Sequence, residues 1–378
     1  MILGKNIQCT GCGLCEVVCP KNTLKIKKSS EGFYKSFQVN DNCNECGLCE
    51  RICPVYQTNE FNRPKSFVSA YSKNPETRKS CSSGGIAHEI GTLMLSKGYE
   101  VCGVIYENDK EMALHTISNN YKDLEDIKGS KYIQSYTPDA FKQIVNKIKN
   151  SKYLIFGTPC QIAAINHYSE LVNKRNHLIL VDFLCHGTPS YLLWQGYMRY
   201  LTQKKKLYII KNVRFRDKKY GWHNYTMAIE TKNGIYYSDR NRDKDFFYEF
   251  FLGNFCLNEA CYNCDFRAIN SYADIRLGDL WGTKYKEDKK GVSGVITFTD
   301  TGENILSLLK ESCVIQEENL ETVLEGQIKG EICVPRSRDS IIKDLRNNRE
   351  LAYIYYRRLV PLKLRRKIKL LFNSLLEG

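Results

Sequence analysis

The chain has 378 residues, of which 42% are hydrophobic, so it is long and apolar enough to bury a core and to form two or three domains. It contains 17 cysteines but begins without the apolar core of a secretory signal, so we expect reduced cysteines in a cytoplasmic protein, used as metal ligands or reactive thiols. No stretch approaches the roughly 18 apolar residues of a membrane-spanning helix, and the net charge of +14 permits acidic partners without selecting one.

Residues 1–60 carry one cysteine pattern twice, in CTGCGLCEVVCP and CNECGLCERICP. Both fit C-x2-C-x2-C-x3-C-P, in which three thiolates bind one [4Fe–4S] cluster and the fourth binds the other. Zinc sites use paired CxxC motifs instead, so the repeat predicts a bacterial-type dicluster ferredoxin domain. We assign the first cluster to Cys9, Cys12, Cys15 and Cys53. We assign the second to Cys43, Cys46, Cys49 and Cys19.

Two alternating segments, TLKIKK and FYKSFQV, separate the half-sites and predict a β-hairpin. A linker at residues 62–66 and a strand at 67–72 follow, and then SCSSGGIAHEIG at 80–91 leads into a helix with a C-terminal signal at Gly98. Backbone N–H groups of a glycine loop at a helix N-terminus can bind phosphate. The alternative is that the loop only caps the helix. The residues concerned are Ser82, Ser83, Gly84 and Gly85.

Two strand–loop–helix units come next, KYLIFGTPCQIAAINHY and HLILVDFLCHGTPSYLLWQGYMRYL. Successive units of this kind form parallel strands whose loops meet at one sheet edge, so we expect an α/β core with a largely parallel sheet and Cys160 near Cys185. The later CYNC motif supplies Cys261 and Cys264, which with the first two complete a ligand set for a third cluster. Alternatively, Cys160 is a low-pKa nucleophile and Cys185 is an ordinary core residue, with Cys256 and Cys81 as substitute ligands.

Six motifs in order, CSSGG, GTPCQ, FLCHGTPS, FRDKKYGW, CYNC and ADIRLGDLWG, resemble the family of coenzyme F420 hydrogenase/dehydrogenase beta subunits over residues 66–320. The resemblance implies a core in two parts, 66–148 and 150–320, with FAD at the sheet edge and iron–sulfur clusters beside it. It places the FAD-phosphate loop at 82–85 and a second flavin-facing loop at Gly157, Thr158 and Pro159. It also matches Cys160, Cys185, Cys261 and Cys264 to the third cluster.

Three further features have two interpretations each. In FRDKKYGWHNY, basic and aromatic side chains alternate, which suits either a flat anionic substrate or a solvated hairpin tip. His186 can donate a proton to reduced flavin or substrate, or can simply bond the backbone of its glycine turn. Residues 345–378 predict a basic amphipathic tail, which either lies on the inner face of an anionic membrane or packs on its own domain.

These motifs predict an iron–sulfur flavoprotein oxidoreductase that passes electrons between [4Fe–4S] clusters and FAD. A flavin converts between one-electron and two-electron carriers, so a two-electron partner is expected, and the resemblance implies coenzyme F420 or another small-molecule acceptor. The alternative is a non-catalytic subunit that relays electrons to a partner protein. Nucleic acid is not expected, since no recognised binding motif accompanies the charge.

Overall fold

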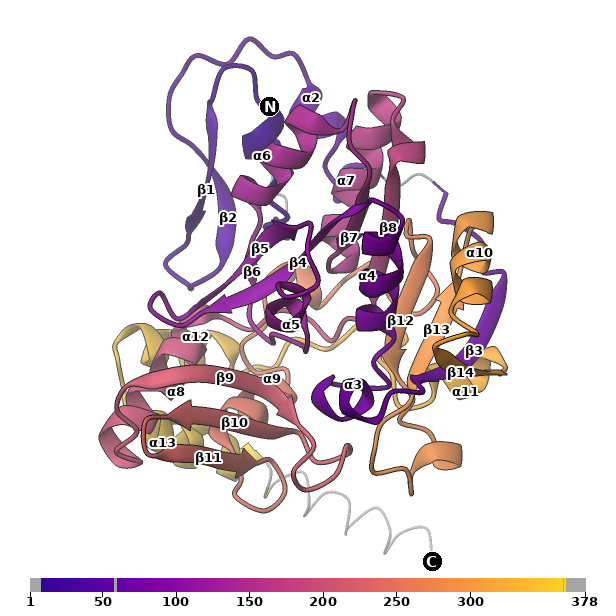
Figure 1. Ribbon diagram of the computed structural model, residues 1–378. Coiled ribbons are helices and arrows are strands. Elements are labelled where there is room, and N and C mark those ends of the chain that lie inside the picture. The colour runs from indigo at the N-terminus through magenta and orange to yellow at the C-terminus, as the bar shows by residue number, and fades with distance from the viewer. Residues whose placement is uncertain (1–7, 58–59, 363, 365–378) are drawn as a thin grey trace, which may run out of the picture.

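A computed structural model describes residues 8–57, 60–362 and 364. Figure 1 shows a ferredoxin-like part around the hairpin β1–β2, a large central sheet, and a smaller sheet beside it. The strands are β1 Leu24–Lys28, β2 Tyr34–Gln38, β3 Ser66–Ser72, β4 Glu100–Glu107, β5 Met112–Ser118, β6 Ser135–Tyr136, β7 Tyr153–Phe156, β8 Leu178–Phe183, β9 Ile210–Asp217, β10 Thr226–Thr231, β11 Gly234–Asp239, β12 Ile275–Asp279, β13 Ser293–Thr297 and β14 Cys313–Glu317.

The helices connect and cover these strands. They are α1 Leu14–Val18, α2 Leu48–Arg51, α3 Pro75–Ser80, α4 Ile86–Ser96, α5 Leu124–Ile127, α6 Pro138–Lys147, α7 Pro159–Leu171, α8 Tyr191–Lys204, α9 Phe246–Phe251, α10 Asp300–Leu308, α11 Leu320–Leu324, α12 Arg338–Arg346 and α13 Leu351–Ile354. A π-helical turn, Tyr355–Leu359, continues α13. The predicted basic tail, residues 345–378, lies outside the described residues at 363 and 365–378, and its described part packs Leu351, Ile354 and Leu359 into the core.

The α/β fold is confirmed, but the central sheet is mixed. Its order is β14-β3-β13-β12-β8-β7-β4-β5-β6. Neighbours are parallel from β12 through β8 and β7 to β4, whereas β3, β13 and β14 pair antiparallel, as do β4 and β5. The expectation of a largely parallel sheet therefore holds for the strands from β12 to β4 and for β5 with β6. It does not hold elsewhere, because β13 lies antiparallel between β12 and β3, and β5 returns antiparallel to β4 after a short turn.

The loops that were expected to meet do so. Strands β7 and β8 are parallel neighbours, with Tyr153 opposite Leu178, so the loops that follow them leave the same edge. Strand β3 runs in the same direction as both, because two antiparallel steps through β13 separate it from β12. Its C-terminal end therefore reaches that edge too, although α3 intervenes before the glycine loop and α4 then crosses to β4.

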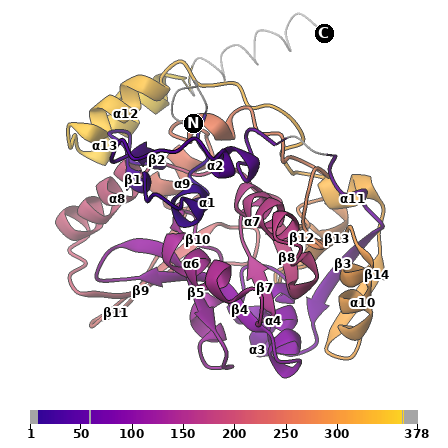
Figure 2. The ribbon, with the colours of Figure 1, turned by 90° about the horizontal axis from the view of Figure 1, so that it is seen from above.

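Two apolar layers cover the central sheet, one on each face (Figures 1 and 2). Alternate residues of β7 point to opposite sides: Leu154 packs with α4 and α10, and Ile155 packs with α6 and α7. The second layer is continuous with Leu14 and Val18 of the ferredoxin-like part. The hairpin β1–β2 is confirmed and pairs Leu24 with Gln38. The smaller antiparallel sheet, β11-β10-β9, lies against α8 and α9.

A fully buried ion pair ties β8 to β12. Arg276 donates to Asp182 at 2.6 Å, and the two side chains are 0% and 1% exposed. Removing one partner leaves an uncompensated charge in the interior, which destabilises a protein by about 3–5 kcal/mol.

We predict that Asp182→Ala lowers the thermal unfolding midpoint of anaerobically prepared protein. Asp300→Ala breaks the exposed pair with Lys65 and is the control, with almost no expected shift. Equal shifts in the two variants would contradict the prediction.

Candidate functional site

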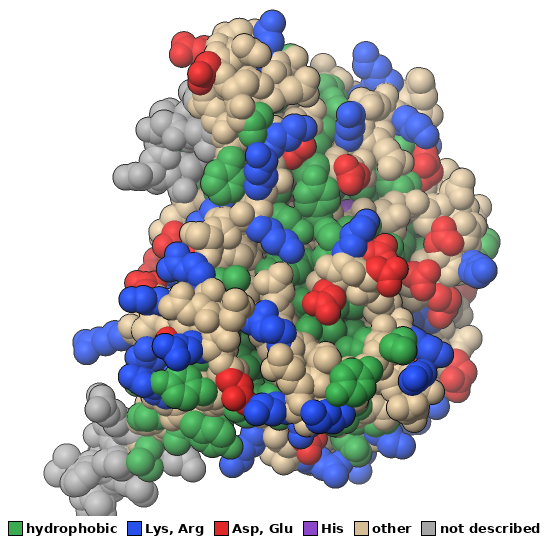
Figure 3. Space-filling view, turned by 90° about the vertical axis from the view of Figure 1, so that its left-hand side faces the viewer, with side chains coloured by type: hydrophobic (Ala, Val, Ile, Leu, Met, Phe, Trp, Pro, Cys, Tyr) green, Lys and Arg blue, Asp and Glu red, His purple; other side chains and the backbone are tan. Residues whose placement is uncertain are grey.

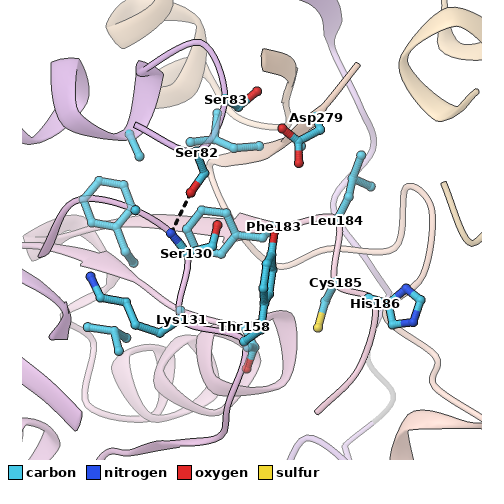
Figure 4. A pocket seen from close by; sticks show the side chains of 18 of the residues that line it. Ser82, Ser83, Ser130, Lys131, Thr158, Phe183, Leu184, Cys185, His186 and Asp279 are labelled. Atoms are coloured by element: carbon cyan, nitrogen blue, oxygen red, sulfur yellow. Dashed lines mark hydrogen bonds between the residues drawn. The ribbon is translucent and has the colours of Figure 1, made fainter. Parts of the chain in front are cut away.

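A cavity of about 370 Å3 lies at the sheet edge where the loops meet (Figure 4). Its walls come mainly from residues 81–88, 127–135, 156–161, 183–189, 266–268, 277–281 and 326–328, with single residues such as Thr10 and Phe251 from other segments. This volume is within the range of about 300–1,000 Å3 that small-molecule and cofactor sites occupy. The cavity therefore brings the glycine loop, the GTPC loop and the CHG loop to one space.

Helix α4 presents its N-terminus to this cavity. Its N-cap is Gly85, which has φ of 93° and no side chain, so no side-chain hydrogen bond caps the helix. The next three residues, Ile86, Ala87 and His88, also line the cavity. The first N–H groups of a helix have no intrahelical partner, and the helix dipole adds partial positive charge there. This end of α4 is therefore suited to a phosphate group.

The four residues of the SSGG loop differ in their placement. Ser82 accepts a hydrogen bond from the Ser130 N–H at 2.8 Å, which leaves its own hydroxyl hydrogen available (Figure 4). Ser83 lines the cavity but directs its hydroxyl to the Val292 carbonyl at 2.9 Å. Gly84 is outside the cavity lining, and its N–H donates to Ser293 Oγ at 3.0 Å. Gly84 thus packs against the central sheet, whereas Gly85 and Ser82 face the cavity.

Sequence reasoning missed the segment at 128–131, which forms the opposite wall. Gly129, with φ of 83°, turns the chain so that the Ser130 N–H meets Ser82. Lys131 donates to three carbonyl groups at the end of α5, and burial lowers its pKa to about 7. The only sequence signal was two lysines flanking Gly-Ser, and the contact with Ser82 spans 48 residues.

A second half-buried lysine supports the glycine loop from outside. Lys218 donates to the carbonyls of Arg78 and Ser83, each at 2.5 Å. Burial lowers the pKa of Lys218 to about 8, and the nearby Cys81 opposes this shift. Cys81 itself lines the cavity at this end and is a buried thiol. Positive charge therefore surrounds the loop at which an anionic group would bind.

The second predicted flavin-facing loop reaches the cavity in part. Gly157 and Thr158 line it, whereas Pro159 is the first residue of α7 and is buried outside it. The Thr158 N–H donates to Gln161 Oε1 at 2.9 Å, which fixes the start of α7. The Thr158 hydroxyl lies 3.3 Å from Cys160 Sγ.

Four cysteines gather beside the cavity, two of them in its lining. Burial raises the pKa of the Cys160 thiol to about 12, and Cys264 and Cys185 add to that rise. Burial likewise raises the pKa of Cys185 to about 11, with a further contribution from Cys264. The pKa of Cys261 is raised by burial and then by Cys185, Cys160 and Cys264. The structure thus places Cys160, Cys185, Cys261 and Cys264 close enough to interact electrostatically.

The raised pKa of Cys160 bears on its alternative role as a nucleophile. A nucleophilic cysteine needs a low pKa and a thiolate, whereas burial holds this thiol protonated. Cys256, the other proposed substitute ligand, is buried beside Arg338 and has no thiol among the groups that shift its pKa. The grouping therefore favours shared ligation by the four cysteines over a nucleophilic Cys160.

The two cysteine sets assigned from spacing stay predictions, and the contacts of the N-terminal cysteines support them. Cys53 of the second motif interacts with Cys12 and Cys15 of the first. A separate cavity of about 60 Å3 is lined by the cysteines of the other set, Cys19, Cys43, Cys46 and Cys49. In the described residues no three Cys, His, Asp or Glu side chains converge on one metal ion. A cubane cluster binds each thiolate to a different iron, so its ligands surround a space instead.

The three cysteine sets are neighbours in order. Cys49 of the second set interacts with Cys15 and Cys53 of the first. Cys160 of the third set raises the pKa of Cys12. The side chain of Thr10, in the first ferredoxin loop, forms a hydrogen bond with Cys160, and Thr10 also lines the large cavity. The second set therefore lines the small cavity, the first set follows it, and the third set lies beside the large cavity.

Two other predicted features have defined surroundings. His186 lines the cavity next to Cys185 and packs edge-on against Phe251 at 4.9 Å between ring centres. Burial lowers its pKa to about 4, so the ring is neutral at physiological pH.

In the FRDKKYGWHNY segment, Arg216 is buried and donates to the Trp222 carbonyl at 2.9 Å. Arg216 also pairs with Asp279, so its charge is used within the protein.

Comparison with known proteins gives two domain matches. Residues 150–323 match the family of the C terminus of the coenzyme F420 hydrogenase/dehydrogenase beta subunit, and residues 8–56 match a 4Fe-4S dicluster domain. The F subunit of F(420)H(2) dehydrogenase from Methanosarcina mazei is 24% identical over 322 residues, which cover 82% of this chain and 84% of that protein. A chain of the F420-reducing [NiFe] hydrogenase complex from Methanosarcina barkeri is 16% identical, with a TM-score of 0.49 over 79% of this chain and 93% of that one.

A search of the described residues finds no helix long and apolar enough to cross a membrane.

The crossed pairing of the ferredoxin motifs can be tested with single cysteine variants. We predict that Cys19→Ser damages the cluster of the second motif and that Cys53→Ser damages the cluster of the first, each with a loss of up to about four irons per chain. The matched control is Cys333→Ser, because this thiol is exposed and belongs to none of the three sets. The two cluster signals are separated by electron paramagnetic resonance. If each variant lost the signal of its own motif's three cysteines, the crossed assignment would be wrong.

Proposed function

We propose that this chain, an iron–sulfur electron-transfer member of the family of coenzyme F420 hydrogenase/dehydrogenase beta subunits, is a flavin-dependent oxidoreductase with three [4Fe–4S] clusters and one FAD. The observation that carries the proposal is the shared wall of the large cavity. Its lining includes both the uncapped N-terminus of α4 and the thiols Cys160 and Cys185. A phosphate-bearing redox cofactor in this space would therefore lie beside the third cysteine set.

The residues present fit FAD. The diphosphate would lie against the first turn of α4, with the Ser82 hydroxyl and the 128–131 segment opposite it. The apolar walls for the ring system come from Phe156, Phe183 and Leu184, which approach from the ends of β7 and β8. A flavin supplies the exchange between one-electron and two-electron carriers. The chain contributes the binding site.

The cysteine sets fit clusters in the same way. Buried thiols with raised pKa values release their protons only where a strongly positive group stabilises the thiolates, and iron would be such a group. Backbone and hydroxyl donors then bond the sulfurs: the Thr188 N–H donates to Cys261 Sγ at 3.4 Å, and the Thr23 N–H to Cys19 Sγ at 3.3 Å. Such bonds raise cluster reduction potentials. Cys46 is exposed, so a second cluster bound there would be open to a partner.

We propose coenzyme F420 or a chemically similar small molecule as the two-electron partner. The support is the name of the Methanosarcina mazei relative, which belongs to an F(420)H(2) dehydrogenase. That relative is named as a subunit, which supports an additional protein partner at the surface near Cys46. Basic side chains are spread over the face in Figure 3 among fewer acidic ones, and this charge would attract an acidic redox protein.

The second candidate function is a non-catalytic relay that passes electrons to a partner protein. It is favoured because the Methanosarcina mazei relative is named as a subunit. The two functions differ in what oxidises or reduces the flavin. A catalytic protein exchanges electrons with a small molecule alone, whereas a relay requires the partner protein. Anaerobic stopped-flow absorbance with reduced coenzyme F420 separates them: flavin reduction without partner protein supports the catalytic function, and its absence supports the relay.

Flavin binding should depend on the N-terminus of α4. We predict that Gly85→Ala weakens FAD binding by about tenfold or more, since φ of 93° is strained for alanine by about 1–2 kcal/mol. The control is Gly98→Ala at the other end of α4, where φ is 78° and an added Cβ meets no atom within 4 Å. Titration of flavin-free protein with FAD measures both. Equal affinities, or no FAD binding by the wild type, would contradict a phosphate site at this helix.

Metal content tests the third cluster. We predict about twelve irons per chain in anaerobically purified protein, falling to about eight in a Cys261→Ser, Cys264→Ser double variant. Iron, sulfide and flavin are measured on one sample. About eight irons in the wild type would contradict a third cluster and leave the two ferredoxin clusters intact.

A further inference from the structure

One buried arginine beside the third cysteine set lacks a complete set of partners. Arg267 follows Cys264 by three residues and is 7% exposed. One terminal nitrogen, Nη2, donates to the Cys261 carbonyl. Its Nε and Nη1 atoms are buried and have no hydrogen-bond partner in the described parts of the chain. No acidic side chain among these residues forms an ion pair with it.

A second arginine of the same region shows the contrast. Arg276 is completely buried, and Asp182 accepts from its Nε at 2.7 Å and from its Nη2 at 2.6 Å. Its remaining donors bond the carbonyls of Phe266, Ala268 and Asn270. The fold therefore satisfies one buried guanidinium completely and leaves the other with unused donors. An unpaired buried charge is costly, so Arg267 needs a negatively charged neighbour.

The surroundings identify that neighbour. Arg267 lies in the wall of the large cavity together with Cys160 and Cys185, and its Nη2 bonds the carbonyl of Cys261. Once the four thiols are ionised, they place more negative charge at this point than the iron core neutralises. A cation with free N–H groups can both offset this charge and donate to the sulfurs.

We propose that Arg267 is a positioning residue that supplies the counter-charge of the third cluster and raises its reduction potential. The proposal rests on the proposed function, since it requires a cluster at Cys160, Cys185, Cys261 and Cys264. Positive charge stabilises the reduced cluster, which is the more negative form, and N–H donors to the sulfurs act in the same direction. The cluster next to the cavity therefore holds an electron more readily than the same cluster without Arg267.

The test compares Arg267→Gln, Arg267→Lys and the control Arg346→Gln, which removes one exposed positive charge from α12. Redox titration followed by electron paramagnetic resonance gives the midpoint of the signal that is lost in the Cys261→Ser, Cys264→Ser variant. We expect a lower midpoint in Arg267→Gln, a smaller shift in Arg267→Lys, and no shift in the control. The two ferredoxin signals in the same sample are internal references and should not move.

Several outcomes would overturn the proposal. Unchanged midpoints in the Gln and Lys variants would remove the electrostatic role. Loss of the cluster's irons in both variants would assign Arg267 to folding of the loop, because lysine preserves the charge. Weaker FAD binding with an unchanged midpoint would assign the free donors to a ligand in the cavity. A wild-type protein without the third signal would instead refute the proposed function, which keeps the two failures distinct.

Discussion

The site depends on one constraint, the common direction of β3, β7, β8 and β12. Each of these strands ends at the same edge of the central sheet. The segment that follows each strand carries a glycine turn or a cysteine. Strand β3 achieves this from the far side of the sheet, since its antiparallel partner β13 is itself antiparallel to β12. Helix α4 then spans the intervening strands and brings its N-terminus to the cavity. If β3 ran in the opposite direction, its glycine loop would lie at the other edge.

Electrostatics sets the chemistry of this edge. Burial raises the pKa of the cysteine thiols and lowers the pKa of Lys131 and Lys218, so desolvation disfavours every charged form here. The fold offsets part of this by bonding both lysines to backbone carbonyls. Arg267 is the exception, since only one of its nitrogens is bonded. An edge built in this way is most stable when anionic groups occupy it.

The sequence was informative wherever the chemistry is local. The spacing of C-x2-C-x2-C-x3-C-P dictates which thiolates can reach one cluster, and alternation or apolar periodicity predicted the hairpin, the strands β7 and β8 and the helix α4. The presence of the glycine loop was predictable, but the difference between Gly84 and Gly85 was not. It depends on Ser293, 209 positions away, which accepts the Gly84 N–H.

Contacts between segments that are far apart in the sequence explain the other features that the sequence did not predict. The 128–131 wall has no periodic pattern of its own, and its role follows from the bond to Ser82. The mixed sheet follows from the antiparallel return of β13 and β14, which a series of strand and helix signals does not reveal. The placement of Arg267 was equally hidden, because an arginine three residues after a cysteine is ordinary until its burial and missing partners are known.

The ferredoxin-like part is built into the core rather than attached by a flexible linker. Gln134 accepts from the Tyr34 N–H at 2.7 Å and donates to the Tyr34 carbonyl at 3.2 Å, and Thr137 donates to the Cys12 carbonyl at 2.8 Å. Leu14 and Ile52 share one apolar layer with helices α6 and α7. Because electron transfer weakens steeply with separation, this packing matters for function. It holds the first cysteine set beside Cys160, so clusters at the three proposed sets would follow one another within one packed structure.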